Sequence, residues 1–400
     1  MSFIHRHIEP RLIKAAESYP VVTVTGPRQS GKTTLVRTLF PGNGYVTLED
    51  PVQREFATND PRGFLGQFEG PVTIDEAQRV PDLFSYVQVI VDETGQAGQF
   101  ILTGSQNFLL LNRVSQSLAG RCAVLHLLPF SRAELWGEPM MDLSLIGQEL
   151  PRGSDDGHDL FETLFAGGYP RIHDIGLAPQ DWLANYYQTY IERDVREVLN
   201  VGDLDLFRRF VGLCAGRVGQ LLDLTSLGND CGIAHSTARR WLGVLEASFI
   251  AKRIQPHYRN FNKRLIKSPK LYFLDTGLLC YLLRIRTPED LRLHANRGGI
   301  FESWVVSEAT KNFLNRSWEP DIYFWRDSTG NEVDLLIENG PGLTAIEIKS
   351  AQTFSPSFLD GLKYMRSLSG NQNLQAAVVY GGNETYAREG MHILPWHRWG

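Results

Sequence analysis

The sequence has few cysteines and no long apolar run. Its four cysteines are far apart and form neither a CxxC pair nor a Cys/His cluster, which argues against a disulfide framework and a structural zinc site. No stretch approaches the ~20 apolar residues of a membrane span, and the first residues lack the apolar core of a signal peptide. We therefore expect a cytoplasmic protein with no membrane partner.

Neither sign of charge dominates the composition. The chain has 40 Lys and Arg residues against 45 Asp and Glu residues, a formal charge of -5, so any basic surface for nucleic acid must be local. With 400 residues, of which 42% are hydrophobic, the chain is too long for one ordinary domain and too apolar to be disordered. We expect two or three globular domains.

Short β-branched runs alternate with helical patterns from Pro20 to Leu128, which is typical of a parallel α/β sheet. The expected strands are 21–25, 45–48, 72–74, 99–103 and 122–128. An irregular segment rich in Gly, Pro and Asp follows, then a helical region, and α/β alternation returns near residue 298. The predicted divisions are an α/β core at 1–135, a helical region at 136–203, a basic module at 204–297 and an α/β domain at 298–400.

A phosphate-binding motif lies between the first predicted strand and a helix. Residues 26–33 match G-x-x-x-x-G-K-[ST], a loop whose backbone N–H groups bind phosphate, so ATP with Mg²⁺ is the expected ligand. We expect Lys32 to reach the β- and γ-phosphates and the Thr33 hydroxyl to ligate Mg²⁺. The predicted nucleotide-binding residues of the loop are Gly26, Pro27, Arg28, Gln29, Ser30, Gly31, Lys32, Thr33 and Thr34.

Two adjacent carboxylates follow the third predicted strand. Asp75 and Glu76 stand at the strand's C-terminal end, where parallel sheets bind ligands. We expect Asp75 to hold Mg²⁺ through water and Glu76 to polarise the attacking water. Ser105 follows the next strand and either senses the γ-phosphate or caps a helix.

These motifs, with Ser-Leu-Ala-Gly-Arg121 and Gly167-Gly-Tyr-Pro-Arg171, resemble bacterial and archaeal AAA+ ATPases of the AAA_14 type, over essentially the whole chain. The resemblance implies a P-loop core with a five-stranded parallel sheet, a helical lid and a homo-oligomeric, hexameric ring. It also implies an arginine before the fifth strand that reaches the neighbouring subunit's γ-phosphate, where Arg121 stands and Arg113 is the second candidate. Arg171 is similar in position to the lid arginine of the bacterial Holliday-junction branch-migration motor, which implies phosphate contact in cis; a structural role is the alternative.

A basic segment follows the lid. Apolar spacing over 224–245, around the turn at Cys231-Gly232, predicts a helix-turn-helix. Residues 235–274 contain nine Lys or Arg and one acid, Glu246, a local charge of +8, which favours DNA binding without base readout. The predicted DNA contacts are Arg239, Arg240, Arg259, Lys263, Arg264 and Lys267. The alternative is a solvated basic face or a subunit contact. A winged helix in this position also resembles the branch-migration motor.

The last domain has Glu302 in a helical pattern, then Asp334, then Glu347 and Lys349 in an E-x-K pair on predicted strands. In this arrangement Asp334 and Glu347 would bind Mg²⁺ or Mn²⁺, and Lys349 would lower the pKa of the attacking water. The pattern resembles the PD-(D/E)XK nuclease superfamily, which includes archaeal Holliday-junction resolvases, and implies a restriction-endonuclease-like fold. Val333 replaces the proline usual in that pattern, and the domain either cleaves DNA or is catalytically silent.

Together these observations predict an ATP-hydrolysing motor that remodels branched or single-stranded DNA and carries a nuclease-like domain. Two other classes of function remain open. One is an ATP-switched DNA-binding protein without nuclease activity, of a regulatory, defence or toxin–antitoxin type. The other is a protein remodeller whose basic surface contacts acidic clients.

Overall fold

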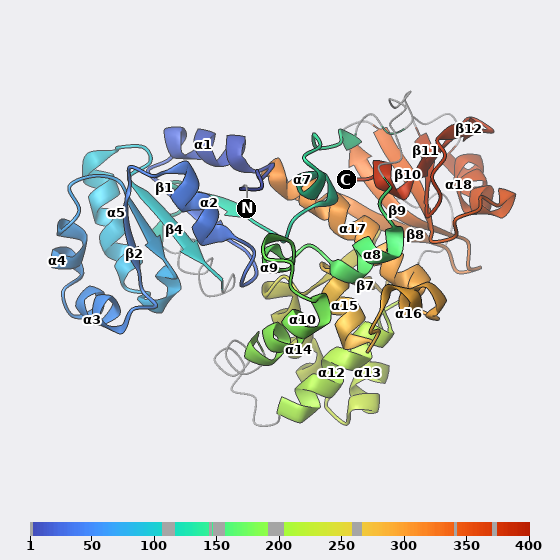
Figure 1. Ribbon diagram of the computed structural model, residues 1–400, viewed down its shortest axis with the longest axis horizontal. Coiled ribbons are helices and arrows are strands. Elements are labelled where there is room, and N and C mark those ends of the chain that lie inside the picture. The colour runs from blue at the N-terminus through green and yellow to red at the C-terminus, as the bar shows by residue number, and fades with distance from the viewer. Residues whose placement is uncertain are drawn as a thin grey trace.

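The computed structural model describes residues 3–105, 117–143, 146, 157–190, 204–257, 266–339, 342–369 and 374–400. An N-terminal α/β core lies at one side of the molecule, and helices and a second sheet form the larger remainder (Figure 1). Among the helices of these ranges, none combines the length and apolar character that a membrane crossing needs.

The core contains a five-stranded parallel sheet in the order β2-β3-β4-β1-β5. Its strands are β1 (Val21–Thr25), β2 (Gly44–Thr47), β3 (Val72–Asp75), β4 (Phe100–Gly104) and β5 (Cys122–His126). Its helices are α1 (Glu9–Ser18), α2 (Lys32–Leu39), α3 (Pro51–Asn59), α4 (Pro61–Gly66) and α5 (Leu83–Thr94). Because successive strand residues point to opposite faces, Val21 and Val22 enter two separate apolar clusters, one on each face. The prediction of five parallel strands is confirmed.

The segments after the core are mainly helical. They comprise α7 (Arg132–Trp136), α8 (Leu160–Ala166), α9 (Pro170–Asp174), α10 (Pro179–Tyr190), α12 (Leu204–Gly216), α13 (Leu224–Cys231), α14 (His235–Ala247), α15 (Thr276–Leu282), α16 (Pro288–Leu293) and α17 (Arg297–Asn315). The predicted helix-turn-helix corresponds to α13 and α14. Gly232 between them has a φ of 80°, a left-handed conformation that favours glycine.

The second sheet has eight strands in the order β12-β13-β11-β10-β9-β8-β6-β7. They are β6 (Ala251–Pro256), β7 (Lys270–Phe273), β8 (Ile322–Arg326), β9 (Glu332–Asn339), β10 (Gly342–Lys349), β11 (Leu374–Tyr380), β12 (Tyr386–Arg388) and β13 (Met391–Pro395), with α18 (Asp360–Ser369) packed beside β9 and β10. The hairpin β6–β7 comes from the predicted basic module, yet β6 pairs with β8 in parallel. One sheet and one apolar core therefore extend across the predicted boundary between 204–297 and 298–400.

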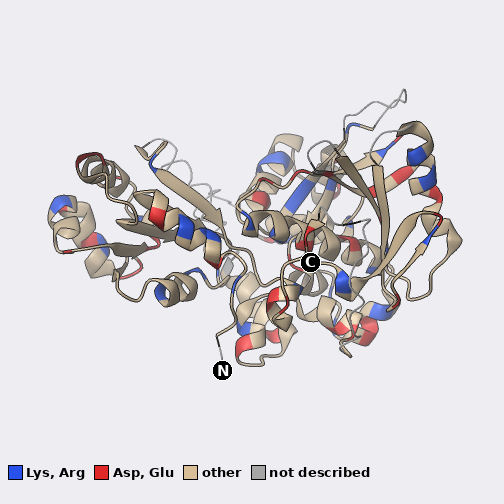
Figure 2. Cartoon of the chain, turned by 90° about the horizontal axis from the view of Figure 1, so that it is seen from above, with Lys and Arg blue, Asp and Glu red and all other residues tan. Residues whose placement is uncertain are grey.

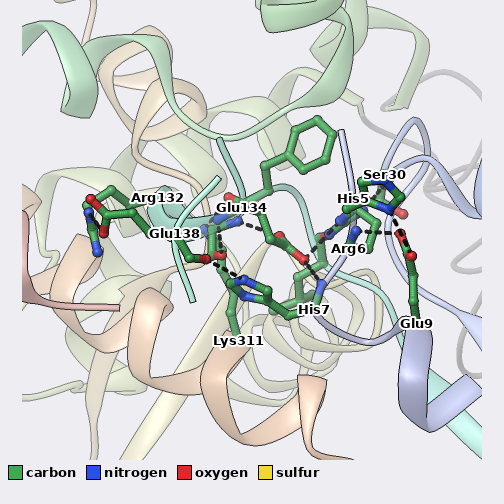
Figure 3. A network of polar contacts seen from close by, with 12 residues as sticks. His5, Arg6, His7, Glu9, Ser30, Arg132, Glu134, Glu138 and Lys311 are labelled. Atoms are coloured by element: carbon green, nitrogen blue, oxygen red, sulfur yellow. Dashed lines mark hydrogen bonds and ion pairs between the residues drawn. The ribbon is translucent and has the colours of Figure 1, made fainter. Parts of the chain in front are cut away.

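A buried polar network joins the core to the rest of the molecule (Figure 3). The Arg6 guanidinium Nε lies 3.1 Å from Glu134 Oε1, and both side chains are buried. Burial raises the pKa of Glu134, but Arg6 and the backbone N–H groups that bond to it lower that pKa below its usual value. Beside this pair, the backbone N–H of Arg132 donates to Glu308 Oε2 at 2.9 Å. The network thus links α7, which follows the core, to α17.

Two glycines allow the close approach of segments at this junction. A Cβ on Gly168 would stand 2.4 Å from the carbonyl oxygen of Phe130. A Cβ on Gly167, whose φ is +68°, would stand 2.5 Å from Asp275 Oδ1. Side chains are excluded at both positions.

We predict that Gly168→Ala destabilises the protein by roughly 1–3 kcal/mol, because the added methyl group must displace backbone. The matched control is Gly243→Ala on α14, where a Cβ would have no neighbour within 4 Å and helix propensity favours alanine by up to about 1 kcal/mol. Thermal unfolding is the measurement. Equal melting temperatures for the Gly168→Ala variant and the wild type would contradict the packing described.

Candidate functional site

The phosphate loop lies between the buried strand β1 and the start of α2, as predicted. Its backbone turns through positive φ at Gly26 (157°), Gln29 (62°) and Gly31 (93°). A Cβ on Gly26 would stand 2.0 Å from the carbonyl oxygen of Leu127, so only glycine fits there. The loop therefore presents its backbone N–H groups at a helix N-terminus, where anions bind.

Lys32 and Arg6 hold the loop from two sides. The Lys32 ammonium donates to the carbonyl oxygens of Gly26 at 3.0 Å and Pro27 at 2.8 Å. Arg6 donates to the carbonyl oxygens of Ser30 at 3.0 Å and Leu128 at 2.7 Å (Figure 3). Arg6 lies outside every motif, and nothing in the sequence before the loop marks it as functional.

The predicted Mg²⁺ ligands are in contact. Thr33 Oγ1 donates to Asp75 Oδ2 at 3.0 Å, and the hydroxyls of Tyr45 and Thr103 also donate to this carboxylate. Burial, followed by the Asp75 charge, raises the pKa of Tyr45 to about 12, so Tyr45 remains a donor. A hydroxyl and a carboxylate offer the hard oxygen ligands that Mg²⁺ requires, and the residues present fit the predicted ion.

Glu76 and Ser105 are also brought together, across the ends of β3 and β4. Glu76 accepts hydrogen bonds from Ser105 Oγ at 3.2 Å and from the Gln78 amide. Its backbone is left-handed, with a φ of 55°, a strained conformation that is common at active sites. The alternative role of Ser105, as a cap, concerns a predicted helix in residues 106–116, which lie outside the described part of the chain. Arg113, the second candidate for the arginine that reaches a neighbouring subunit, lies in the same undescribed residues.

The lid completes a pocket at the phosphate loop. A cavity of about 450 Å³ is lined by Glu76, by Pro170, Arg171 and Asp174 of α9, and by residues 28, 29 and 31–34 of the loop region. Arg171 thus faces the phosphate loop of its own chain, as the resemblance implies. The segment before it is anchored by the buried Asp275, whose Oδ2 accepts from the Gly168 backbone N–H at 2.8 Å. Asp275 is a positioning residue that the motifs did not reveal.

Arg121 lies at the opposite end of the sheet from its own phosphate loop. Cys122 is in register with Val21, the first residue of β1, whereas the loop follows the last. The Arg121 side chain is 36% exposed and pairs with Asp92 of α5, with Nη2 and Oδ2 2.9 Å apart. It therefore does not reach the phosphate loop of its own chain.

The four predicted nuclease residues converge in the C-terminal domain, together with residues that were not predicted. The cluster consists of Lys270 and Tyr272 from β7, Glu302 from α17, Glu332 and Asp334 from β9, and Glu347 and Lys349 from β10. Lys349 Nζ lies 3.3 Å from Asp334 Oδ2 and 2.5 Å from Glu347 Oε1. An ammonium group thus bridges the two carboxylates that were expected to share a metal.

Burial and charge govern this cluster. Burial, followed by the charge of Asp334, raises the pKa of Glu302 to about 7 and that of Glu347 to about 8. Within the described ranges, no group of three or more His, Cys, Asp or Glu side chains is arranged to hold a metal ion. The arrangement therefore does not fit the predicted Mg²⁺ or Mn²⁺ at Asp334 and Glu347, because the Lys349 ammonium group lies between these two acids.

Only some of the basic residues that the structure describes in the basic module are exposed. Arg239 and Arg240 on α14 are exposed, as predicted, and so is Lys267. In contrast, Arg253 pairs with Glu246 at 2.6 Å, and Lys270 is buried. The predicted contacts Arg259, Lys263 and Arg264 lie outside the described residues. Along the described parts of the chain, Lys and Arg are interspersed with Asp and Glu (Figure 2).

Two solved structures show weak likeness to the chain. The Walker-type ATPase PABY2304 of Pyrococcus abyssi is 16% identical, with 70% of this chain and 96% of that chain covered and a TM-score of 0.45. The RuvB Holliday junction branch migration motor of Thermotoga maritima is 21% identical, with 63% and 90% covered and a TM-score of 0.32. With TM-scores below 0.5, neither likeness bears on the activity of this chain.

Matches to family models and to two relatives identify the family of the chain. An AAA domain model matches residues 18–136, and two models for domains of unknown function, DUF8612 and DUF4143, match residues 157–289 and 297–399. The uncharacterized proteins Rv2008c of Mycobacterium tuberculosis and Mb2031c of Mycobacterium bovis are each 32% identical over 389 residues, which cover 95% of this chain and 81% of theirs. The chain belongs to the family of these two mycobacterial proteins, and within it residues 18–136 form a P-loop AAA domain.

Proposed function

We propose that this protein is a Mg²⁺-dependent ATPase that binds branched or single-stranded DNA and uses ATP hydrolysis to remodel it. The observation that carries the ATPase is the joint placement of Thr33, Asp75 and Glu76 beside the phosphate loop. DNA remodelling rests on a weaker observation, the exposed arginines of α14 in a helix-turn-helix.

The residues of the pocket have separate roles in hydrolysis. Thr33 and Asp75 would hold Mg²⁺, which when bound supplies positive charge to the phosphates. Lys32 and the loop N–H groups bind the phosphate oxygens. Glu76, fixed by Ser105 and Gln78, orients and polarises the attacking water, since phosphoryl transfer depends on positioning and charge stabilisation. Arg171 contacts phosphate from the lid, and Arg121 reaches the pocket of a neighbouring subunit in a homo-oligomeric ring.

The DNA surface is built on α14. Arg239, Arg240 and Lys267 are exposed, and long cationic side chains of this kind bind phosphates without base readout. A second candidate function is an ATP-switched DNA-binding protein that does not cut DNA. It is favoured by the ammonium group of Lys349 between Asp334 and Glu347.

Lys32→Ala should lower ATP turnover at least ~100-fold, because the phosphates lose their buried cation. Glu76→Gln should slow hydrolysis to a similar degree yet bind ATP with unchanged affinity, because the amide does not polarise water. Lys14→Ala, at an exposed lysine of α1, is the control and should behave as the wild type. Phosphate release and binding of a fluorescent ATP analogue measure the two effects; full turnover in Glu76→Gln would remove this residue from the mechanism.

Arg121→Ala should lower turnover by roughly 10³-fold, the usual size of an arginine-finger effect. Mixing it with Lys32→Ala subunits should restore part of the activity, because each variant supplies the group that the other lacks. Asp92→Asn breaks the same ion pair but leaves the arginine, so it should retain turnover. Equal loss in Arg121→Ala and Asp92→Asn, without rescue on mixing, would show that Arg121 has only a structural role.

The double variant Arg239→Ala/Arg240→Ala should bind forked and single-stranded DNA more weakly. The slope of log affinity against log salt concentration should fall by about 2, one for each lost phosphate contact. Arg62→Ala, at an exposed arginine of α4 in the core, controls for a general change of charge. Fluorescence anisotropy across a salt series measures both quantities. Unchanged affinity and slope would exclude α14 as the DNA surface.

A further inference from the structure

Lys270 is the most unusual residue of the C-terminal cluster. It begins β7, and its side chain is only 4% exposed. A buried lysine needs several compensating partners. Its ammonium group forms an ion pair with Glu332 and lies 3.7 Å from Glu302 Oε2 and 3.9 Å from Asp334 Oδ1. These three carboxylates come from α17 and β9. A single cation of β7 therefore connects α17 to β9.

The position of this ammonium group is set by the backbone and by packing. Lys270 is held in the ladder opposite Ile254 of β6 and bridges to Leu221. Its Nζ lies 5.5 Å from the centre of the Phe324 ring, which covers the side chain. The cation therefore has little freedom to leave the carboxylates, in contrast to Lys349, whose side chain is 33% exposed.

The four carboxylates of this cluster are close together and partly buried, so nearby positive charge is needed to compensate them. In metal-dependent sites built from such acids, a divalent cation supplies it through oxygen ligands. Here one ammonium group lies among Glu302, Glu332 and Asp334, and a second lies between Asp334 and Glu347. We propose that Lys270 is a built-in cation that takes the place of a divalent metal ion in this cluster. The cluster then stabilises the fold and binds no metal while Lys270 is present.

One buried carboxylate oxygen of the cluster is left without compensation. Glu347 Oε2 is buried and has no hydrogen-bond partner among the described residues. Without the ammonium group of Lys270, its three carboxylate partners would lose one positive charge. Glu302 would keep the Tyr272 hydroxyl, Asp334 would keep Lys349, and Glu332 would keep Arg326. Replacing Lys270 by methionine, which keeps the apolar stem and removes only the charge, should therefore convert the cluster into one that binds divalent cations.

The test compares the full-length wild type with Lys270→Met and with Lys363→Met, without nucleotide, in EDTA and in Mn²⁺. Lys363 pairs with Glu389 on the surface of the same domain and is the matched control. In EDTA, Lys270→Met should melt roughly 5 °C or more below the wild type, because buried carboxylates lose their partner. Mn²⁺ should restore at least half of that loss, beyond any shift that an ion at the phosphate loop gives equally to the wild type and Lys363→Met.

Binding of Mn²⁺, followed by the electron paramagnetic resonance signal of the free ion, gives a second readout. The wild type and its Asp334→Asn variant should bind Mn²⁺ equally, because any ion at the phosphate loop is common to both. If the wild type binds a Mn²⁺ ion that Asp334→Asn does not bind, the proposal is wrong. This comparison tests the proposal even if Lys270→Met does not fold. Destabilisation of Lys270→Met that Mn²⁺ does not reverse would also contradict it.

Discussion

The buried ion pair between Arg6 and Glu134 is the constraint on which the rest of the structure depends. Arg6 also bonds the carbonyl oxygens of Ser30 and Leu128, so one guanidinium fixes the phosphate loop, the end of the central sheet and α7 relative to one another. Removing one partner of such a pair leaves an uncompensated buried charge, at a cost of about 3–5 kcal/mol. The geometry of the nucleotide pocket therefore depends on a contact made outside the nucleotide-binding motifs.

The same junction connects the pocket to the C-terminal domain through α17. Glu308 accepts a hydrogen bond from the Arg132 backbone beside Glu134, and Glu302, on the same helix, belongs to the carboxylate cluster. With a rise of 1.5 Å per residue, these two positions lie about 9 Å apart along the helix axis. The lid is attached at the same place, because Asp275 and Lys311 bond the backbone of Gly168 and Phe130. Core, lid and C-terminal domain thus meet in one polar centre (Figure 3).

Short sequence patterns predicted those features whose residues are close together in the chain. The phosphate loop, the Asp75-Glu76 pair and the helix-turn-helix could be read from the sequence because each depends on residues close together in the chain. Lys270 could not, since its partners are 32 to 64 residues away, and its membership of a basic segment indicated a surface charge. The pairing of β6 with β8 across residue 298 could not be predicted for the same reason, because it is a long-range contact. Arg6 has no sequence signal at all.

The central claim is that the pocket beside the phosphate loop hydrolyses ATP in the service of DNA remodelling. Steady-state phosphate release by the wild-type protein, with Mg²⁺ and with increasing forked DNA at low and high salt, tests it most directly. We expect Mg²⁺-dependent release that forked DNA stimulates at low salt, with less stimulation at high salt because phosphate contacts are screened. Release that no DNA changes at any salt concentration would contradict the role in DNA remodelling, and the absence of release under all conditions would contradict the ATPase itself.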